Sequence, residues 1–207
     1  MARIALLACF LTTLSAVEFR VAPVPERQIE KMRATTWRLG CPVAPEDLRQ
    51  VTVTYLNFDR KVVTGVLFVH TDVAKEISEI FRDLFKHRFQ IEKITPVEDY
   101  GGSDDASMAA NNTSAFNCRS VTGKPGTFSN HSWGLAIDIN PLTNPYVKGD
   151  NVSPPEGRKY LDRTRSLPGI IRDGDFVVSR FKRAGWKWGG DWNDLKDYQH
   201  FEKAARR

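Results

Sequence analysis

The sequence predicts a single α+β domain in which helices pack around a small antiparallel sheet. Three patterns in the 207 residues lead to this expectation. Two β-branched and aromatic segments, 51–56 and 62–69, are separated by a polar gap that favours a turn. Apolar residues recur at helical spacing between 73 and 85, and they alternate with small or polar residues between 135 and 140. A chain of this length has room for one domain with a hydrophobic core.

The composition excludes several classes of protein. Apolar residues make up 41% and charged residues 27% of the chain, which are globular values and argue against a disordered or a membrane-embedded protein. The net charge of +5 is modest. No run of Lys and Arg interleaved with aromatic residues marks a nucleic-acid groove, so we expect no nucleic-acid partner.

Two segments precede the expected domain, which we place at residues 37–207. Residues 1–16 have a basic start, an apolar run and small residues typical of a cleavage site, so we expect a signal peptide. The protein would then be exported, periplasmic or extracellular, without stable membrane insertion. The alternative is a hydrophobic first helix or strand in a cytoplasmic protein that is released on cell lysis. Residues 17–36 are polar with two prolines, which favours a linker or an N-terminal arm. Cys41 and Cys118 remain after a leader, either as a disulfide or as two free thiols.

The first half of the predicted domain is a hairpin followed by a helix. The polar residues 57–61 separate the two strand segments, so we expect these strands to pair in antiparallel fashion. Thr71 and Asp72 can accept hydrogen bonds from free N–H groups where the helix begins. His70 and His87 flank the helix, and we expect both to be surface or capping residues and not ligands.

Irregular segments dominate the second half. Residues 99–119 form a polar loop of a length that is typical of functional loops. Residues 141–168 contain five prolines and predict a rim loop that holds at most one short helix and borders a cleft. Residues 176–184 predict a second helix, ended by Gly185, and residues 186–188 predict an aromatic strand.

The residues suited to chemistry gather in two places. Alternation over 135–140 directs Asp138 away from the core, and a glycine between it and His131 permits a turn that brings the imidazole back toward the carboxylate. Near the C-terminus, Asp197 lies three residues before His200, so a helical or tight-turn segment projects both side chains the same way. A lone His and Asp is typical of a hydrogen-bonded pair, and the prediction of a metal therefore depends on both places together.

Together, His131, Asp138 and His200 have the composition of a hydrolytic zinc site. Such a site needs three protein ligands and one open position for water. A carboxylate must also take the proton of the attacking water and pass it to the leaving amine. Asp197 is the candidate for this task, and its alternative is a solvated surface acid. We predict one zinc ion.

Two longer patterns resemble a known family. Ser-x-His-x-x-Gly-x-Ala-x-Asp at 129–138 and Asp-x-x-His-Phe-Glu at 197–202 resemble the zinc D-alanyl-D-alanine carboxypeptidase and L-alanyl-D-glutamate endopeptidase family, which includes phage endolysins. The likeness continues through 111–119 and 185–192 and covers most of the chain from about Trp37. It implies a Hedgehog/DD-peptidase-like fold and hydrolysis of peptidoglycan stem peptides.

The resemblance also implies roles for individual residues. The three predicted ligands match the zinc ligands of the family, and Asp197 matches its acidic catalytic position. Arg119 matches an arginine beside the scissile carbonyl, where a fixed guanidinium can stabilise the developing oxyanion. Ser129 matches a substrate-contacting serine, although its hydroxyl is equally suited to satisfying the loop backbone.

These observations predict a monomeric zinc peptidase that acts on cell-wall peptides, as a carboxypeptidase or as an endopeptidase. The alternative is a non-catalytic module that keeps the metal and tethers a wall peptide or a protein partner. Retention of both Asp197 and Arg119 argues against that alternative, because a structural zinc needs neither. A serine hydrolase would lack its Gly-x-Ser-x-Gly turn, and a thermolysin-like protease its His-Glu-x-x-His motif.

Overall fold

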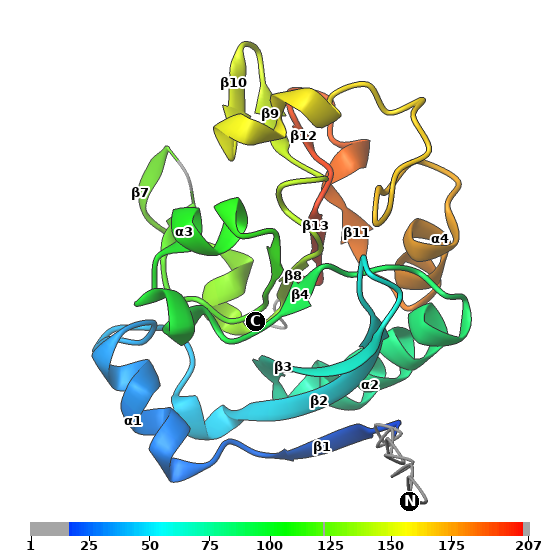
Figure 1. Ribbon diagram of the computed structural model, residues 1–207. Helices are drawn as coiled ribbons and strands as arrows, with labels where there is room; N and C mark the ends of the chain where they lie inside the picture. The colour runs from blue at the N-terminus through cyan, green and yellow to red at the C-terminus, as the bar shows by residue number, and fades with distance from the viewer. Residues whose placement is uncertain (1–16, 122, 205–207) are drawn as a thin grey trace, which may run out of the picture.

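The N-terminal layer of the computed structural model, which describes residues 17–121 and 123–204, is a three-stranded antiparallel sheet (Figure 1). Its strands, in spatial order, are β1 (Phe19–Pro23), β2 (Leu48–Leu56) and β3 (Val62–His70). The predicted hairpin is confirmed, because β2 and β3 pair from Leu48–His70 to Leu56–Val62 around the polar turn. β-branched residues make these two strands the longest in the described chain.

Helix α2 (Thr71–Lys86) packs against this sheet and supplies much of the core. Its apolar residues recur three or four positions apart, as the sequence predicts, and Ile77, Phe81 and Leu84 are among those fully buried. His70 caps the helix, since its ring nitrogen accepts a hydrogen bond from the N–H of Asp72 at 3.2 Å. The expectation that Thr71 or Asp72 provides the cap is therefore wrong, because both already belong to the first turn.

Residues 17–36 are not a linker. β1 pairs with β2 over five residue pairs, and helix α1 (Glu26–Ala34) buries Ile29 and Met32. These two residues lie three positions apart and therefore share one helix face. The two prolines that suggested a linker end β1 and precede α1, positions where a missing N–H is tolerated. The predicted signal peptide at 1–16 lies outside the described residues.

Short elements make up the rest of the described chain. The helical ones are η1 (Pro45–Asp47), η2 (Val97–Tyr100), α3 (Asp104–Ala109), η3 (Asn130–Trp133), η4 (Pro155–Tyr160), α4 (Phe176–Arg183) and η5 (Gly189–Asp191). The strands are β4 (Lys93–Ile94), β5 (Asn112–Thr113), β6 (Ser120–Val121), β7 (Lys124–Phe128), β8 (Ala136–Asp138), β9 (Tyr146–Lys148), β10 (Asn151–Ser153), β11 (Lys187–Trp188), β12 (Lys196–Asp197) and β13 (His200–Glu202).

Two further three-stranded antiparallel sheets hold the C-terminal half, in the orders β11-β13-β8 and β10-β9-β12. The α+β class is thus confirmed, with several small sheets in place of one. The β9–β10 hairpin lies in the segment predicted to be an irregular rim loop. Each of its strands has only three residues and one valine, too little alternation to mark a strand in the sequence.

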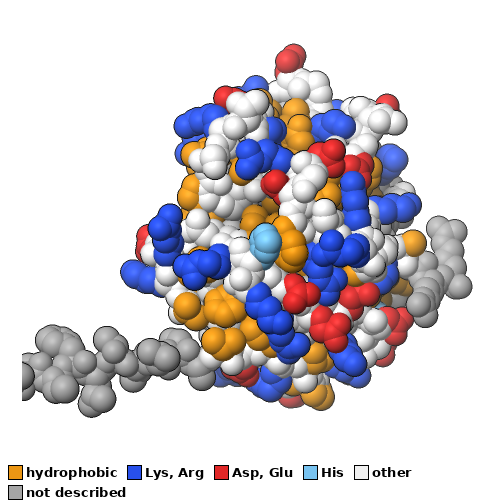
Figure 2. Space-filling model, turned by 90° about the vertical axis from the view of Figure 1, so that its right-hand side faces the viewer, with side chains coloured by type: hydrophobic (Ala, Val, Ile, Leu, Met, Phe, Trp, Pro, Cys, Tyr) orange, Lys and Arg blue, Asp and Glu red, His pale blue; other side chains and the backbone are white. Residues whose placement is uncertain are grey.

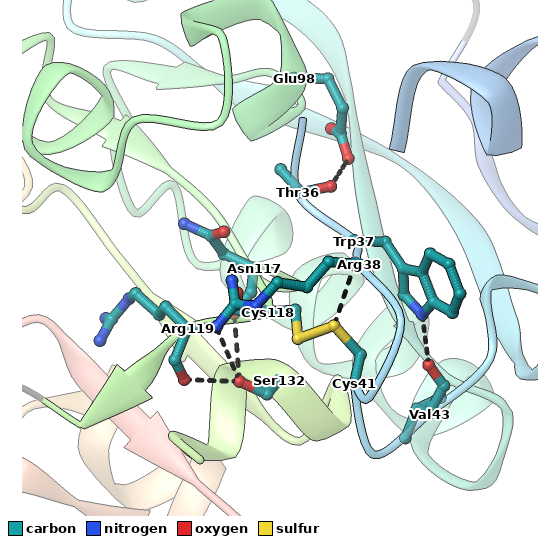
Figure 3. The surroundings of a disulfide bond; sticks show 10 residues. All are labelled: Thr36, Trp37, Arg38, Cys41, Val43, Glu98, Asn117, Cys118, Arg119 and Ser132. Carbon is teal, nitrogen blue, oxygen red and sulfur yellow. Dashed lines mark hydrogen bonds between the residues drawn. A yellow bond between two sulfur atoms is a disulfide. The ribbon is translucent and has the colours of Figure 1, made fainter. Parts of the chain in front are cut away.

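A disulfide joins Cys41 to Cys118 and closes a small second core (Figure 3). This core contains Met32, Leu48 and Phe116. Hydrogen bonds reinforce the link, because the guanidinium of Arg38 donates to the carbonyl oxygen of Cys118 at 2.9 Å. Of the two alternatives that the sequence left open, the structure has the disulfide.

Basic and acidic side chains are interspersed over the surface, as the face in Figure 2 shows. This mixture agrees with 30 basic and 25 acidic residues in the chain. Within residues 17–121 and 123–204, no helix has the length and apolar character that crossing a bilayer requires.

Candidate metal centre

A turn and a strand place the first two predicted ligands side by side. Ser129 caps η3, and Gly134 ends it with a φ of 64°, so the chain reverses between His131 and Asp138. A Cβ atom on Gly134 would lie 2.6 Å from the backbone nitrogen of His70, which leaves no room for another residue. The predicted turn at this glycine is confirmed.

Strand pairing brings in the third ligand. β13 pairs with β8 in antiparallel register, and His200 lies directly opposite Asp138. Opposed residues of an antiparallel pair project from the same face of the sheet. The neighbouring residues Ile137 and Phe201 point the other way into the core, where the Phe201 ring stacks on that of Phe181 with centroids 4.1 Å apart.

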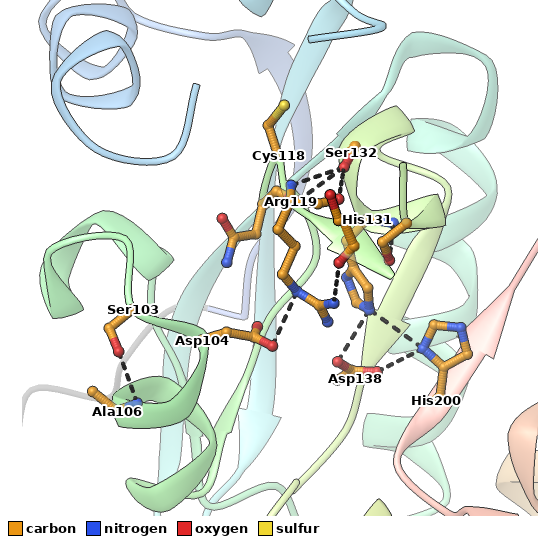
Figure 4. Close-up of polar contacts among 12 residues, drawn as sticks. Ser103, Asp104, Ala106, Cys118, Arg119, His131, Ser132, Asp138 and His200 are labelled. Atoms are coloured by element: carbon orange, nitrogen blue, oxygen red, sulfur yellow. Dashed lines mark hydrogen bonds and ion pairs between the residues drawn. The ribbon is translucent and has the colours of Figure 1, made fainter. Parts of the chain in front are cut away.

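The three side chains meet at one buried point (Figure 4). Asp138 Oδ2 lies 3.1 Å from Nε2 of His131, and Asp138 Oδ1 lies 2.9 Å from Nδ1 of His200. The two ring nitrogens are 3.3 Å apart. The exposed fractions are 2% for His131, 4% for Asp138 and 7% for His200, so the ligand atoms are largely removed from bulk water.

Hydrogen bonds on the outer side fix which nitrogen of each ring faces this point. Nδ1 of His131 lies 2.6 Å from the carbonyl oxygen of Ala115, which can only accept, so Nδ1 carries the proton and Nε2 faces inward with its lone pair. Nε2 of His200 lies 3.2 Å from Oε2 of Glu202, and the same oxygen accepts from Nδ2 of Asn130 at 2.6 Å. Outer hydrogen bonds of this kind are typical of metal-ligating histidines.

The charges at the centre shift each other's protonation. Burial alone would raise the pKa of Asp138, but the His131 and His200 imidazoles hold that pKa well below its usual range. Burial alone would lower the pKa of His200, but hydrogen bonds to Asp138 and Glu202 raise this pKa to about 10. The hydrogen bond from His200 in turn lowers the pKa of Glu202. Without a metal, these shifts favour an ionised Asp138 beside a protonated His200.

These residues fit a zinc ion. Their three ligand atoms lie within 4.8 Å of one another, and two imidazole nitrogens with one carboxylate oxygen form a donor set that zinc accepts. Both imidazoles present a ring nitrogen whose orientation is already fixed. The centre also opens to one side, because Asp138 lines a cleft of about 490 Å³.

Asp197 and Arg119 line the same cleft. Asp197 ends β12, and a two-residue turn separates it from His200, so the tight-turn prediction is confirmed. Its Oδ1 atom has no hydrogen-bond partner among the described residues. Burial raises the pKa of Asp197 to about 6; the nearby His200 opposes this shift and the Asp138 carboxylate adds to it.

Arg119 is held in place from both ends. Its Nε lies 3.0 Å from Oδ2 of Asp104, the first residue of α3 (Figure 4). Its backbone N–H donates to the Ser132 hydroxyl at 2.9 Å, and that hydroxyl donates to the Arg119 carbonyl oxygen at 2.8 Å. The disulfide fastens the preceding residue, Cys118. The guanidinium therefore reaches the cleft from a rigid segment.

Ser129 differs from the other candidates. It is buried, its hydroxyl accepts a hydrogen bond from the N–H of His131 at 3.3 Å, and it is not among the described residues that line the cleft. This geometry is that of the backbone-satisfying alternative. The predicted rim loop does border the cleft, through Tyr146 of β9 and residues 151–156.

The sequence did not identify Glu202, Asn130 or Asp104 as supporting residues. Glu202 follows His200 by two positions on a strand and so shares its face, a signal that was present. The pairing of Asp104 with Arg119 and of Asn130 with Glu202 joins residues far apart in the chain, and no local pattern indicates either contact.

Residues 122–203 match a family model described as D-alanyl-D-alanine carboxypeptidase, Peptidase_M15_4. The matched segment is less than half of the chain, and it contains the three buried candidate ligands and Asp197. Arg119 lies just before it. No solved structure matches the chain. The match supports the family resemblance that the sequence patterns indicate and, with it, a peptidase of the carboxypeptidase type.

Proposed function

We propose that this protein is a zinc metallopeptidase that hydrolyses peptide bonds in the stem peptides of peptidoglycan. The observation that carries the proposal is the convergence of His131, Asp138 and His200 at one buried point, with Asp197 and Arg119 on the cleft beside it. A purely structural metal would need neither of the last two residues. Their position therefore favours turnover over a non-catalytic binding module.

Each cleft residue has a chemical task in this proposal. His131, Asp138 and His200 would hold the zinc ion, which would supply Lewis acidity to a water molecule and to the substrate carbonyl. Asp197 takes the proton from the attacking water at its unpartnered Oδ1 and delivers it to the leaving amine. Burial favours the protonated form of this carboxyl, so Asp197 is suited to hold the proton between the two steps.

Arg119 and Tyr146 both line the cleft in which the substrate would bind. The Arg119 guanidinium, fixed through Asp104, donates N–H groups to the oxyanion that forms at the attacked carbonyl. Tyr146 lies opposite Asp197 in the β9–β12 pair and lines the cleft, so its hydroxyl is available to orient the bound peptide. Burial raises the pKa of Tyr146, with the Asp197 carboxylate adding to the effect, and the hydroxyl therefore keeps its proton at neutral pH.

The experiment that tests the function is mass spectrometry of defined muropeptides incubated with the zinc-loaded protein. Loss of a terminal D-Ala would assign a carboxypeptidase, and a cut within the stem would assign an endopeptidase. We expect about one zinc per chain, as a site with three protein ligands and an open position holds a single ion. Chelation should abolish cleavage. Protein that carries a full equivalent of zinc and leaves every muropeptide intact would exclude the proposal.

The proposed site of action is outside the cytoplasm. The Cys41–Cys118 disulfide supports this location, because such bonds persist in oxidising compartments. Cleavage of the predicted leader near Ala16 would also leave β1 complete, since that strand begins at Phe19. N-terminal sequencing of secreted protein tests the proposal, and an intact Met1 on protein from the cytoplasm would contradict it.

A further inference from the structure

A second cavity, of about 460 Å³, lies between the β2–β3 turn, the end of α2 and the segment before α4. It shares no lining residue with the cleft at the metal centre. Arg60, Arg88, Arg172 and His87 line it, against one carboxylate, Asp175, whose Oδ2 lies 3.6 Å from Nε of Arg172. Figure 2 views the molecule from the side of α4, and several Lys and Arg side chains lie near the centre of this face, with acidic side chains among them. The cavity has a surplus of positive charge.

Two of these arginines occupy backbone positions that favour glycine. Arg60 closes the β2–β3 turn with a φ of 61°, and Arg88 follows α2 with a φ of 57°. At the end of α2, the N–H of Arg88 donates to the carbonyl oxygen of Phe85, and the N–H of Phe89 donates to that of Leu84. In this type of helix end, the left-handed residue is usually glycine. Any other residue raises the conformational energy there. Both positions nevertheless carry a guanidinium, and both face one cavity.

Hydrogen bonds hold the walls of the cavity in place. Nε2 of Gln90 donates to the carbonyl oxygens of Asn57 at 3.1 Å and Phe58 at 3.2 Å, which ties the end of α2 to the turn that carries Arg60. On the far wall, the carbonyl oxygen of Gly169 accepts from the side-chain amides of Asn140 and Asn144. The arginines are therefore mounted on a rigid frame.

The remaining wall is also suited to an anion. The His87 ring stacks on that of Phe176, with centroids 3.8 Å apart and planes 11° from parallel. Phe176 is the first residue of the eight-residue helix α4, whose N-terminus carries a partial positive charge.

We propose that this cavity is a binding site for a phosphate group, as free phosphate or as part of a phosphate-bearing polymer. Guanidinium groups match phosphate oxygens with paired N–H donors, and arginines from three separate segments of the chain line this cavity. The charge balance of three arginines against one carboxylate suits an anion with more than one negative charge. The proposal does not depend on peptidase activity, because the two cavities share no lining residue.

The test is an NMR titration of the full-length protein with inorganic phosphate and, separately, with oligomers of glycerol phosphate. Saturable shifts of the Arg88 and Gly169 N–H signals are expected with at least one of these, and the more tightly bound probe identifies the source of the phosphate. Acetate at the same ionic strength serves as the control anion. Shifts confined to Asp138 and His200 would place the phosphate at the metal centre and overturn the proposal, as would the absence of saturation with both probes.

The left-handed backbone conformation of Arg60 and Arg88 permits a variant that removes both guanidinium groups without straining the chain. Arg60→Gly with Arg88→Gly introduces the residue that both positions favour, so the variant should unfold at the same or a higher temperature while phosphate binding weakens by about tenfold or more. Arg60→Asn with Arg88→Asn, which also tolerates this conformation, is the second variant. Arg27→Gln, on the exposed face of α1, is the control with one positive charge removed. Unchanged phosphate affinity in both double variants would overturn the proposal.

Discussion

In the proposed mechanism, Asp197 serves catalysis and not metal binding, so its substitution should separate the two. Asp197→Asn keeps the shape of the residue but removes the ability to accept a proton, so zinc should stay at about one per chain while the rate falls by about 10²–10⁴-fold. Arg119→Ala should also keep zinc, with a loss of about 10²–10³-fold if it stabilises the oxyanion. Metal analysis and muropeptide kinetics of the same preparations measure both effects. Loss of zinc from Asp197→Asn would instead make Asp197 a ligand.

Glu202 acts through His200, and metal affinity should reveal this. Its Oε2 atom lies 3.2 Å from the outer ring nitrogen of His200 and fixes the orientation of the ring. Glu202→Gln replaces a charged acceptor by a neutral one, and zinc should bind about 10–100-fold more weakly in competition with a chelating dye. Glu79→Gln, on the exposed side of α2, is the matched control. Equal affinities in the two variants would remove this role.

Glu98 should make stability depend on pH at a place remote from the metal. Burial raises its pKa, partly offset by the Thr36 hydroxyl, and Oε2 has no hydrogen-bond partner among the described residues (Figure 3). With a folded pKa above the unfolded one, the contribution of Glu98 is complete below the ordinary value of 4.5 and is lost as the pH rises through the raised value. Glu98→Gln should therefore gain in melting temperature relative to the parent between about pH 4 and about pH 8. A difference that is constant over this range would contradict the assignment.

At the scale of elements, helix α1 should behave as part of the core. Met32 is 0% exposed, so Met32→Ala should lower the free energy of unfolding by about 2–5 kcal/mol. Leu39 lies beyond the helix and is 94% exposed. Leu39→Ala should therefore change the free energy of unfolding by less than about 0.5 kcal/mol. Chemical denaturation of both variants measures the contrast. A small effect for Met32→Ala would restore the linker interpretation.

Elements with strong periodicity were predictable, and those defined by distant partners were not. α2 follows from its apolar spacing and β2 and β3 from their β-branched runs. β1 depends on its pairing with β2, because apolar and polar residues alternate only from Phe19 to Val21, too short a run to mark a strand alone. The same holds for β9, which pairs with both β10 and β12. Its three residues stand between Pro145 and Gly149, so its own sequence does not indicate a strand.

For the whole molecule, the disulfide is the largest single restraint on the unfolded chain. It joins residues 77 positions apart, so replacing both cysteines by serine should lower the free energy of unfolding by about 2–5 kcal/mol. Added reductant should destabilise the parent protein and leave the Cys41→Ser, Cys118→Ser variant unchanged in the same denaturation assay. A parent protein whose unfolding ignores the reductant would show that the bond does not form in solution.

The site as a whole was predictable only as far as local motifs extend. The spacing of His131 and Asp138, and of Asp197 and His200, was enough to nominate all four. What the sequence could not supply is the frame: the opposed register of His200 and Asp138, the carbonyl oxygen of Ala115 behind His131, and the acid that holds Arg119. Each of these contacts depends on how separate segments pack, and no local pattern in the sequence indicates that packing.

The chain passes from the β10-β9-β12 sheet to the β11-β13-β8 sheet in the two residues between Asp197 and His200. The candidate ligands Asp138 and His200 belong to the β11-β13-β8 sheet, whereas Tyr146, Asp197 and the β9–β10 hairpin belong to the other. A hairpin of different length or sequence can therefore be exchanged between relatives, or grafted in the laboratory, while the ligand sheet stays intact. The wall proposed to contact the peptide can thus be altered separately from the candidate metal centre.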